Sequence, residues 1–145
     1  MSAYADSSFL FSVYISDSNS PDALKLIEAA GLPLIATPFT ELEVENAIQQ
    51  RLFRRELTGT EAKAAIASFR RDIADFVYDI KPFSAEMFRT ALLISSRHTP
   101  SFGTRSLDVL HVAAAVALGA DEFITFDGKQ AKLAGVEGLK VRGKR

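Results

Sequence analysis

Short apolar runs alternate along the chain with longer segments in which hydrophobic residues recur every three or four positions. The short runs predict buried strands and lie at residues 2–5, 34–37, 122–126 and 139–141. The pattern at residues 77–80 fits the end of a helix as well as a strand and does not decide between them. Strands this short and this apolar are typical of a parallel sheet that is covered on both faces.

The longer segments predict helices, and some of these have clear end signals. Ser20 and Pro21 mark a helix start, because serine caps the first turn and proline fits its first position, and Gly31 ends this helix. Residues 98–105 are expected to form a loop. The other helices are expected over residues 9–15, from Thr40, from about Thr60, over 84–97, over 107–118 and for a short stretch after Gly128. Strands separated by helices predict the α/β class.

Length and composition narrow the class of protein. With 145 residues, 48% hydrophobic and 24% charged, the chain is expected to form a single domain over residues 1–145. It has no cysteine, which excludes disulfides, thiol nucleophiles and cysteine-ligated metal centres. No signal peptide pattern opens it and no apolar run approaches the roughly 18 residues of a membrane span, so we expect a cytoplasmic protein. Its net charge is −1, so a nucleic acid would need a local basic patch.

The helix predicted over residues 107–118 is apolar nearly all round, and Asp108 and His111 are its only polar residues. An ionised carboxylate in apolar surroundings costs several kcal/mol unless a partner compensates it. This helix would be about 18 Å long and the strand that returns after Gly119 about 16 Å, so Asp127 is expected near Asp108. His111 is expected to be a core histidine with a satisfied hydrogen bond.

Two further acids are expected at the same edge of the sheet. Asp6 follows the first strand, and Glu43 lies in the first turn of the helix that follows the second. In an open parallel sheet, the carboxyl ends of the strands and the starts of the following helices share one edge, where ligands bind. Four carboxylates there would repel one another, and oxygen ligands without cysteine suit Mg²⁺ or Mn²⁺. This is the setting of two-metal hydrolysis of phosphodiesters.

Each acid also has a purely structural interpretation. Glu43 could close a capping box with Thr40, and Asp6 could cap the first helix. Asp127 could belong to an ordinary turn, and Asp108 could complement the dipole of its helix. It is the expected convergence of the four acids that favours a functional site.

Four segments, in this order, resemble the PIN domain and in particular the VapC-type toxins: residues 4–8 (YADSS), 40–47 (TELEVENA), 106–115 (SLDVLHVAAA) and 124–127 (ITFD). The resemblance implies a three-layer α/β/α sandwich with a mainly parallel sheet, and a metal-dependent endoribonuclease that hydrolyses RNA. It also implies the toxin of a type II toxin–antitoxin pair. Such toxins are commonly homodimers and are neutralised by a cognate antitoxin.

The resemblance also implies roles for individual residues. The acids that match the metal-holding site of the family are Asp6, Glu43, Asp108 and Asp127. Thr125 matches a hydroxyl residue that orients the site, and Ser7 or Ser8 is expected to do the same.

Two other glutamates, Glu41 and Glu45, lie close to Glu43 in the sequence and are alternative candidates for its place in the site. Its spacing to Asn46 and Ala47 fits the family pattern. Glu41 and Glu45 would point about 160° away from it on a helix of 3.6 residues per turn. Glu43 is therefore the predicted ligand.

Arginines near the expected site are candidates for contacts with RNA phosphates. Arg105 stands just before Asp108, and Arg51 lies two to three turns beyond Glu43 on the same predicted helix. We therefore expect Arg105 and Arg51 to bind the substrate.

The sequence also admits alternatives to the ribonuclease. A PIN-like protein-interaction module without catalysis would use the acids only as caps, and metal binding separates it from the nuclease. A housekeeping nuclease that processes RNA would share the same chemistry. A phosphoacceptor domain is disfavoured, because Asp6 is followed by Ser7 rather than a second acid and no acid follows the strand that ends at Thr37.

Overall fold

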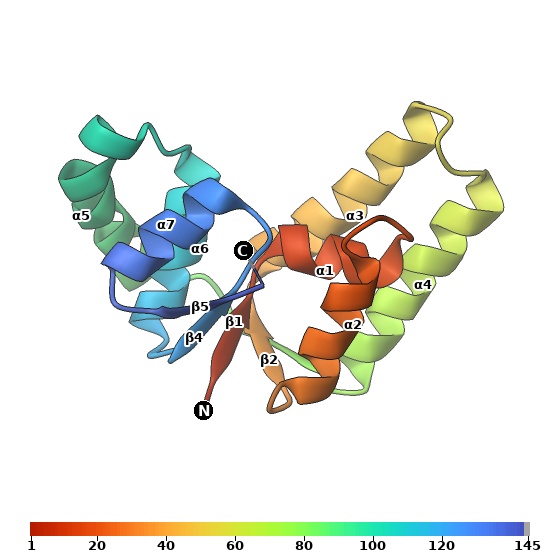
Figure 1. Cartoon of the computed structure of the whole chain (residues 1–145), viewed down its shortest axis with the longest axis horizontal. Helices are drawn as coiled ribbons and strands as arrows, with labels where there is room; N and C mark the ends of the chain where they lie inside the picture. The colour runs from red at the N-terminus through yellow and green to blue at the C-terminus, as the bar shows by residue number, and fades with distance from the viewer. Residues whose placement is uncertain (144–145) are drawn as a thin grey trace.

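A computed structural model gives the fold and describes residues 1–143. Within this range, five strands form one parallel sheet in the order β3-β2-β1-β4-β5 (Figure 1). The strands are β1 (Ala3–Ala5), β2 (Leu34–Ala36), β3 (Tyr78–Ile80), β4 (Glu122–Ile124) and β5 (Lys140–Arg142). Helices cover both faces of this sheet, which confirms the predicted α/β/α sandwich.

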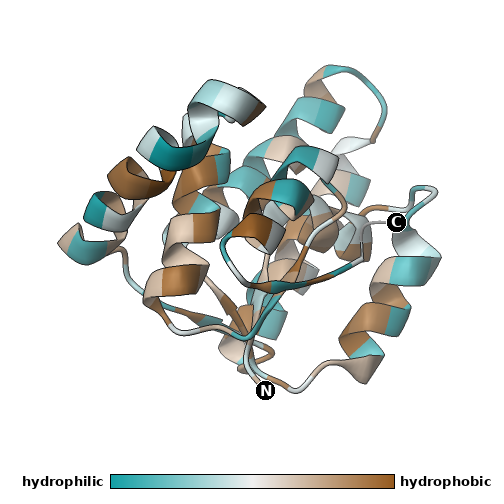
Figure 2. Ribbon diagram, turned by 60° about the vertical axis from the view of Figure 1, so that its left-hand side comes forward, coloured by the Kyte–Doolittle hydropathy of each residue, from teal (hydrophilic) through white to brown (hydrophobic). Residues whose placement is uncertain are grey.

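The helices divide between the two faces. In the described residues they are α1 (Ser7–Tyr14), α2 (Ser20–Ala29), α3 (Pro38–Phe53), α4 (Gly59–Ala74), α5 (Ala85–Phe102), α6 (Ser106–Ala117) and α7 (Gly128–Val136). Helices α1 to α4 lie on one side of the sheet and α5 to α7 on the other (Figure 1). Figure 2 shows hydrophilic and hydrophobic residues on different sides of the helices, as expected for helices that cover a core. Among residues 1–143, no helix has the length and apolar character needed to cross a membrane.

The central strands separate two hydrophobic cores. Ala3 and Ala5 of β1 pack into the core beneath α1 to α4, whereas Tyr4 belongs to the core beneath α5 to α7. Ile124 and Phe123 of β4 divide in the same way, because successive side chains of a strand point to opposite faces. Since β1 lies between β2 and β4, a residue that directly follows β1 is close to both halves of the molecule.

Helix α3 begins earlier than predicted. We expected its start at Thr40, but it begins at Pro38, with Thr37 as its N-cap. Proline fits the first turn, where its missing N–H is not needed. The backbone N–H of Thr37 donates to the hydroxyl of Thr40 at 3.2 Å. This cap leaves the side chain of Glu43 available for other contacts.

The expected loop at residues 98–105 is wrong for its first half. Helix α5 continues through Pro100 to Phe102, and Gly103 ends it with a φ of 61°. Pro100 removes one backbone hydrogen bond close to the helix end, and the Thr99 carbonyl still accepts from the Gly103 N–H at 2.8 Å.

The undecided segment 77–80 contains the strand β3, which pairs with β2. Helix α4 ends at Ala74, and Phe76 takes a φ of 59°, which an α-helix cannot continue. The other element boundaries differ from the predicted ones by at most a few residues.

Candidate active site

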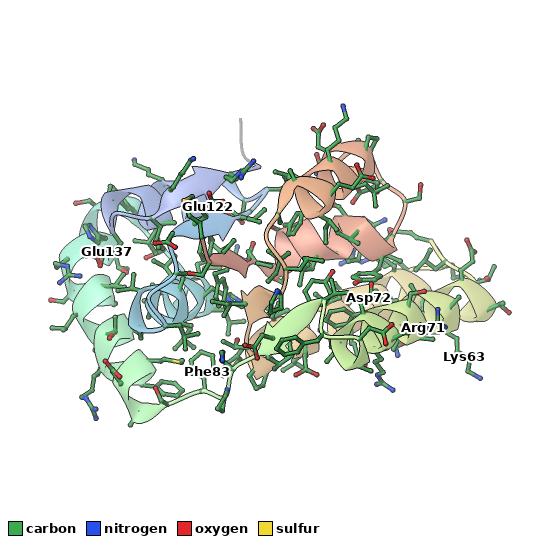
Figure 3. All side chains as sticks on the ribbon, turned by 90° about the horizontal axis from the view of Figure 1, so that it is seen from below. Lys63, Arg71, Asp72, Phe83, Glu122 and Glu137 are labelled. Carbon is green, nitrogen blue, oxygen red and sulfur yellow. The ribbon has the colours of Figure 1, made fainter. Side chains whose placement is uncertain are left out.

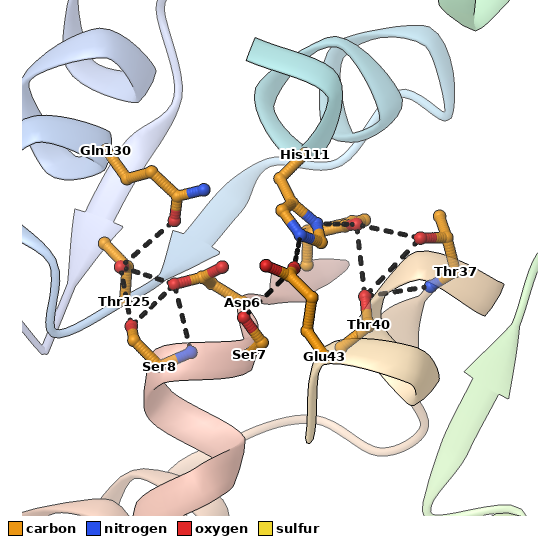
Figure 4. Close-up of polar contacts among 10 residues, drawn as sticks. Asp6, Ser7, Ser8, Thr37, Thr40, Glu43, His111, Thr125 and Gln130 are labelled. Carbon is orange, nitrogen blue, oxygen red and sulfur yellow. Dashed lines mark hydrogen bonds and ion pairs between the residues drawn. The ribbon is translucent and has the colours of Figure 1, made fainter. Parts of the chain in front are cut away.

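The carboxyl ends of β1 and β4 bring Asp6 next to the turn that follows β4. Asp6 is the N-cap of α1 and is only 2% exposed. Its Oδ2 accepts hydrogen bonds from the hydroxyls of Ser8 (2.6 Å) and Thr125 (2.9 Å) and from the Ser8 backbone N–H (3.3 Å) (Figure 4). These hydroxyls accept in turn from the backbone N–H groups of Phe126 (3.1 Å) and Asp127 (3.0 Å). Neutral donors from both strands thus fix this buried carboxylate.

Asp127 caps the next helix rather than forming an ordinary turn. Its Oδ1 accepts from the backbone N–H groups of Lys129 (2.8 Å) and Gln130 (3.0 Å) at the start of α7. The second oxygen of the carboxylate takes no part in these bonds. Asp127 is therefore a helix cap where an ordinary turn was the structural interpretation, and its backbone N–H bonds to the Thr125 hydroxyl that donates to Asp6.

Asp108 lies in the first turn of α6 and is partly buried. Burial raises the pKa of its carboxyl group, and the negative charges of Asp127 and Asp6 raise it further. A hydrogen bond with the backbone of Arg105 and the charge of His111 lower this pKa, but by less. Asp108 is therefore close enough to Asp127 and Asp6 for their charges to repel its own.

In the part of the chain that the structure describes, the charge of His111 is the cationic influence on Asp108, and it outweighs neither burial nor the other aspartates. There, no Lys or Arg side chain forms an ion pair with Asp6, Asp108 or Asp127. Glu122, labelled in Figure 3, is a contrasting case: it is 6% exposed, and Arg142 lies 3.3 Å from its carboxylate. Glu122 thus has an arginine as its ion-pair partner, which the three aspartates lack among the described residues.

Glu43 reaches the site from α3, on the other side of Asp6. Its carboxylate accepts a hydrogen bond from the Ser7 hydroxyl (3.2 Å) and is hydrogen-bonded to Nε2 of His111 (Figure 4). Thr40 bonds to the Thr37 backbone instead of taking part in a capping box with Glu43. The structural interpretation of Glu43 as a capping residue is therefore wrong.

His111 is a core histidine that also contacts the site. The ring is 1% exposed, and its Nδ1 is hydrogen-bonded to the Tyr4 hydroxyl at 2.7 Å. Burial alone would lower its pKa, but the hydrogen bond to Glu43 and the nearby carboxylates outweigh burial and raise it. The sequence indicated the satisfied hydrogen bond but not the bond to Glu43.

The neighbours of Glu43 on α3 are directed differently. Glu45 accepts two hydrogen bonds from the guanidinium of Arg70 on α4, at 3.0 and 2.6 Å. The negative charge of Glu45 raises the pKa of Glu41, after the larger effect of burial. Glu43 is thus the acid of this segment that bonds to the residues of the site.

The chemistry of these side chains fits a hard divalent cation, since all four are carboxylates. Within residues 1–143, however, no three His, Cys, Asp or Glu side chains are already gathered around one point that could hold a metal ion. An ion would therefore have to draw the carboxylates together.

Two hollows meet at these acids. A cleft of about 600 Å³ extends from Glu43 and Asp127 toward Phe11 and Arg51. The Arg51 guanidinium lies 5.1 Å from the centre of the Phe11 ring, and its Nε pairs with Glu56 at 3.0 Å. This side chain is fixed beside the cleft, with its charge partly compensated.

The second hollow lies on the other side of Asp127. It has a volume of about 610 Å³, and Arg105, Asp108 and Lys129 line it. Phe126 and Asp127 line both hollows, so cations stand on either side of the acids. A negatively charged strand could cross the acids between them.

One buried polar residue of the site, Gln130, was not predicted from the sequence. Gln130 is 2% exposed, and its amide, oriented with the nitrogen toward Asp6, donates to Oδ2 (2.7 Å) and Oδ1 (2.9 Å) of that carboxylate. The available signal was a glutamine three residues after the helix cap Asp127, in the segment that follows the last motif of the site.

Comparisons with known proteins agree with this geometry. Residues 3–136 match the family model of the PIN domain, whereas no functionally curated protein matches the chain. The structure of Mycobacterium tuberculosis VapC20, a sarcin–ricin loop cleaving toxin, is similar with a TM-score of 0.74 at 19% identity, over 97% of this chain and 99% of that one. A toxin–antitoxin complex from Klebsiella pneumoniae gives a TM-score of 0.69 at 17% identity, over 95% of each chain. At such identities the solved structures show a shared fold.

Proposed function

The chain belongs to the PIN domain family, and from this we propose that it is a Mg²⁺- or Mn²⁺-dependent endoribonuclease that hydrolyses RNA phosphodiester bonds. The observation that carries the proposal is the group of Asp6, Asp108 and Asp127. Besides burial, the negative charges of Asp127 and Asp6 raise the pKa of Asp108. Within residues 1–143, no Lys or Arg forms an ion pair with any of the three. A divalent cation is the missing compensation.

All four acids would be ligands of the cation. Asp6, Asp108 and Asp127 would hold it from β1, α6 and α7, and Glu43 would join them from α3. Ser7, Ser8 and Thr125 would keep Glu43 and Asp6 in place by the hydrogen bonds described above. A bound cation would supply an activated water and stabilise negative charge on the phosphate in the transition state.

The arginines on either side of the acids would position the RNA. Arg105 and Lys129 line one hollow and Arg51 the other, so phosphates on both sides of the scissile bond would meet a cation. Such contacts fix the register of a strand without reading its sequence. The stacking of Arg51 on Phe11 would limit its freedom and favour a fixed contact.

We also propose that the protein is the toxin of a type II toxin–antitoxin pair in the cytoplasm. The support is the similarity over nearly the whole chain to VapC20 and to a protein of a toxin–antitoxin complex. Its partners would then be an RNA substrate, an antitoxin and a second copy of the chain. Copurification with the product of an adjacent reading frame would test the pair.

An RNA cleavage assay tests the nuclease. The wild type should cut RNA with Mn²⁺ and stop when the cation is chelated, and Asp108→Asn should abolish cleavage without loss of the fold. Asp75→Asn is the matched control, because Asp75 is exposed at the end of α4, outside the site. Retained cleavage by Asp108→Asn would reject the proposed site.

A further inference from the structure

The residues at the start of α7 have the sequence of a capping box, but the glutamine side chain does not complete it. Asp127 is the N-cap of this helix and Gln130 is three residues later, which is the arrangement of a capping box. In that motif the glutamine side chain bonds back to the backbone N–H of the cap residue. Here the Asp127 N–H donates to the Thr125 hydroxyl at 3.0 Å, so it has no need of Gln130.

The side chain of Gln130 turns into the site instead. It is 2% exposed, although glutamine is mostly a surface residue, and it lies beside Thr125 and Asp6 (Figure 4). Figure 4 draws the amide with its oxygen on this side, which would set it against the carboxylate oxygens; with the amide turned over, its nitrogen lies 2.7 Å from Oδ2 and 2.9 Å from Oδ1 of Asp6 and donates to both. A buried amide that bonds a buried carboxylate satisfies two polar groups that would each be costly alone.

The position of this contact distinguishes it from the other bonds to Asp6. Ser8 and Thr125 both donate to Oδ2, and neither of their hydroxyls bonds to Oδ1. Within residues 1–143, Gln130 is the side chain whose amide reaches both oxygens. It therefore restrains Oδ1, the oxygen to which neither hydroxyl bonds, and with it the direction in which the remaining lone pairs of that oxygen point.

We propose that Gln130 is a positioning residue that aligns Asp6 for the divalent cation. The inference rests on the proposed function, because it assumes that Asp6 is a ligand. Partners that orient a ligand typically change metal affinity by 10- to 100-fold when they are replaced. Gln130 would act through Asp6 and would not touch the cation or the RNA.

Titration calorimetry of the metal-free protein with Mn²⁺ tests this. Gln130→Met keeps the length of the side chain and removes the amide, so it separates hydrogen bonding from packing. We expect Gln130→Met to bind Mn²⁺ at least tenfold more weakly than the wild type. Gln49→Met, on the exposed surface of α3, is the matched control and should bind as the wild type does.

The possible results distinguish failure of the positioning role of Gln130 from failure of the proposed function. Equal Mn²⁺ affinity of a folded Gln130→Met and the wild type would overturn the positioning role and leave the nuclease proposal intact. Absence of Mn²⁺ binding to the wild type would overturn both. Selective weakening in Gln130→Met would support the inference.

A second measurement needs no change at position 130 and so does not depend on the folding of that variant. In the wild-type protein, NMR should show side-chain amide protons of Gln130 that exchange slowly with solvent, because they are buried and bonded to Asp6. Asp6→Ala should remove this protection. Fast exchange in the wild type would overturn the inference.

Discussion

Replacing Asp108 by asparagine is expected to stabilise the metal-free protein and to remove its stabilisation by Mn²⁺. Asparagine has nearly the same shape, so packing at the start of α6 is kept and the charge is removed. The raised pKa shows that the folded surroundings disfavour this charge through burial, Asp127 and Asp6. If Asp108 only complemented the helix dipole, the same substitution would destabilise by about 0.3–1 kcal/mol. The sign of the effect therefore separates the two interpretations.

The magnitude follows from the two like-charge contacts. A pair of partly solvated charges interacts by roughly 0.2–1 kcal/mol, and Asp108 faces two other aspartates. Relief of both repulsions gives about 1 kcal/mol, which corresponds to an increase in Tm of roughly 2–4 °C for a domain of this size. With Mn²⁺ at about 100 times its Kd, the wild type should gain roughly 2.7 kcal/mol, or about 5–10 °C. The order of stability should thus reverse when Mn²⁺ is added.

The assay is thermal unfolding of both proteins with chelator and with Mn²⁺, at neutral and acidic pH. Because the folded-state pKa of Asp108 is raised, its protonated form stabilises the fold at low pH. That contribution is lost as the pH rises through the raised value. The advantage of Asp108→Asn should therefore be present at pH 7 and vanish below about pH 3.5, where the carboxyl is protonated in both states. A metal-free variant that melts below the wild type at pH 7 would refute the reasoning.

Three further predictions concern other parts of the molecule. Arg105→Gln should weaken RNA binding and reduce the slope of log K against log salt by about 1, as for one lost phosphate contact; an unchanged slope would exclude that contact. Tyr14→Phe removes the hydroxyl that donates to Asp72 at 2.6 Å and should cost about 1–3 kcal/mol in urea unfolding, so an unchanged midpoint would contradict a structural role for this bond. Gly143→Ala would place a Cβ 2.7 Å from the Thr125 carbonyl oxygen at a φ of +98°, so we expect a lower Tm and weaker Mn²⁺ binding, and a wild-type Tm would show that β5 can shift freely.

The fold could be predicted where the local composition alone determines an element. Residues 107–118 are apolar nearly all round, and the structure has the helix α6 there with half of its residues buried. The end of α5 could not be predicted in this way, because Pro100 favours a helix end. Contacts distant in sequence hold that segment: Lys132 lies 4.3 Å from the centre of the Phe102 ring. A helix terminus that depends on such packing has no local signal.

The candidate site, too, could be predicted from the sequence only in part. The positions of Asp6 and Asp127 follow from the topology of a parallel sheet, because Asp6 comes directly after β1 and Asp127 follows the end of β4 by three residues. The direction of Gln130 does not follow, because the local pattern predicts a bond to the backbone of the helix cap. Its actual partner depends on the pairing of β1 with β4, which places Asp6 within reach. Side chains that choose between a local and a distant partner need the tertiary structure.

The hydrogen bonds around Asp6 also bear on when the protein becomes active. The bonds of Thr125 to Ser8 and Asp6 join positions 117 and 119 residues apart, so they form only after nearly the whole chain has closed on itself. Contacts of such high sequence separation form late, since the entropy of the closed loop opposes them. In refolding, the capacity to bind Mn²⁺ should thus return with the slowest phase that restores native structure. On the proposed function, a growing or partly folded chain would be harmless to the RNA of the cell that makes it.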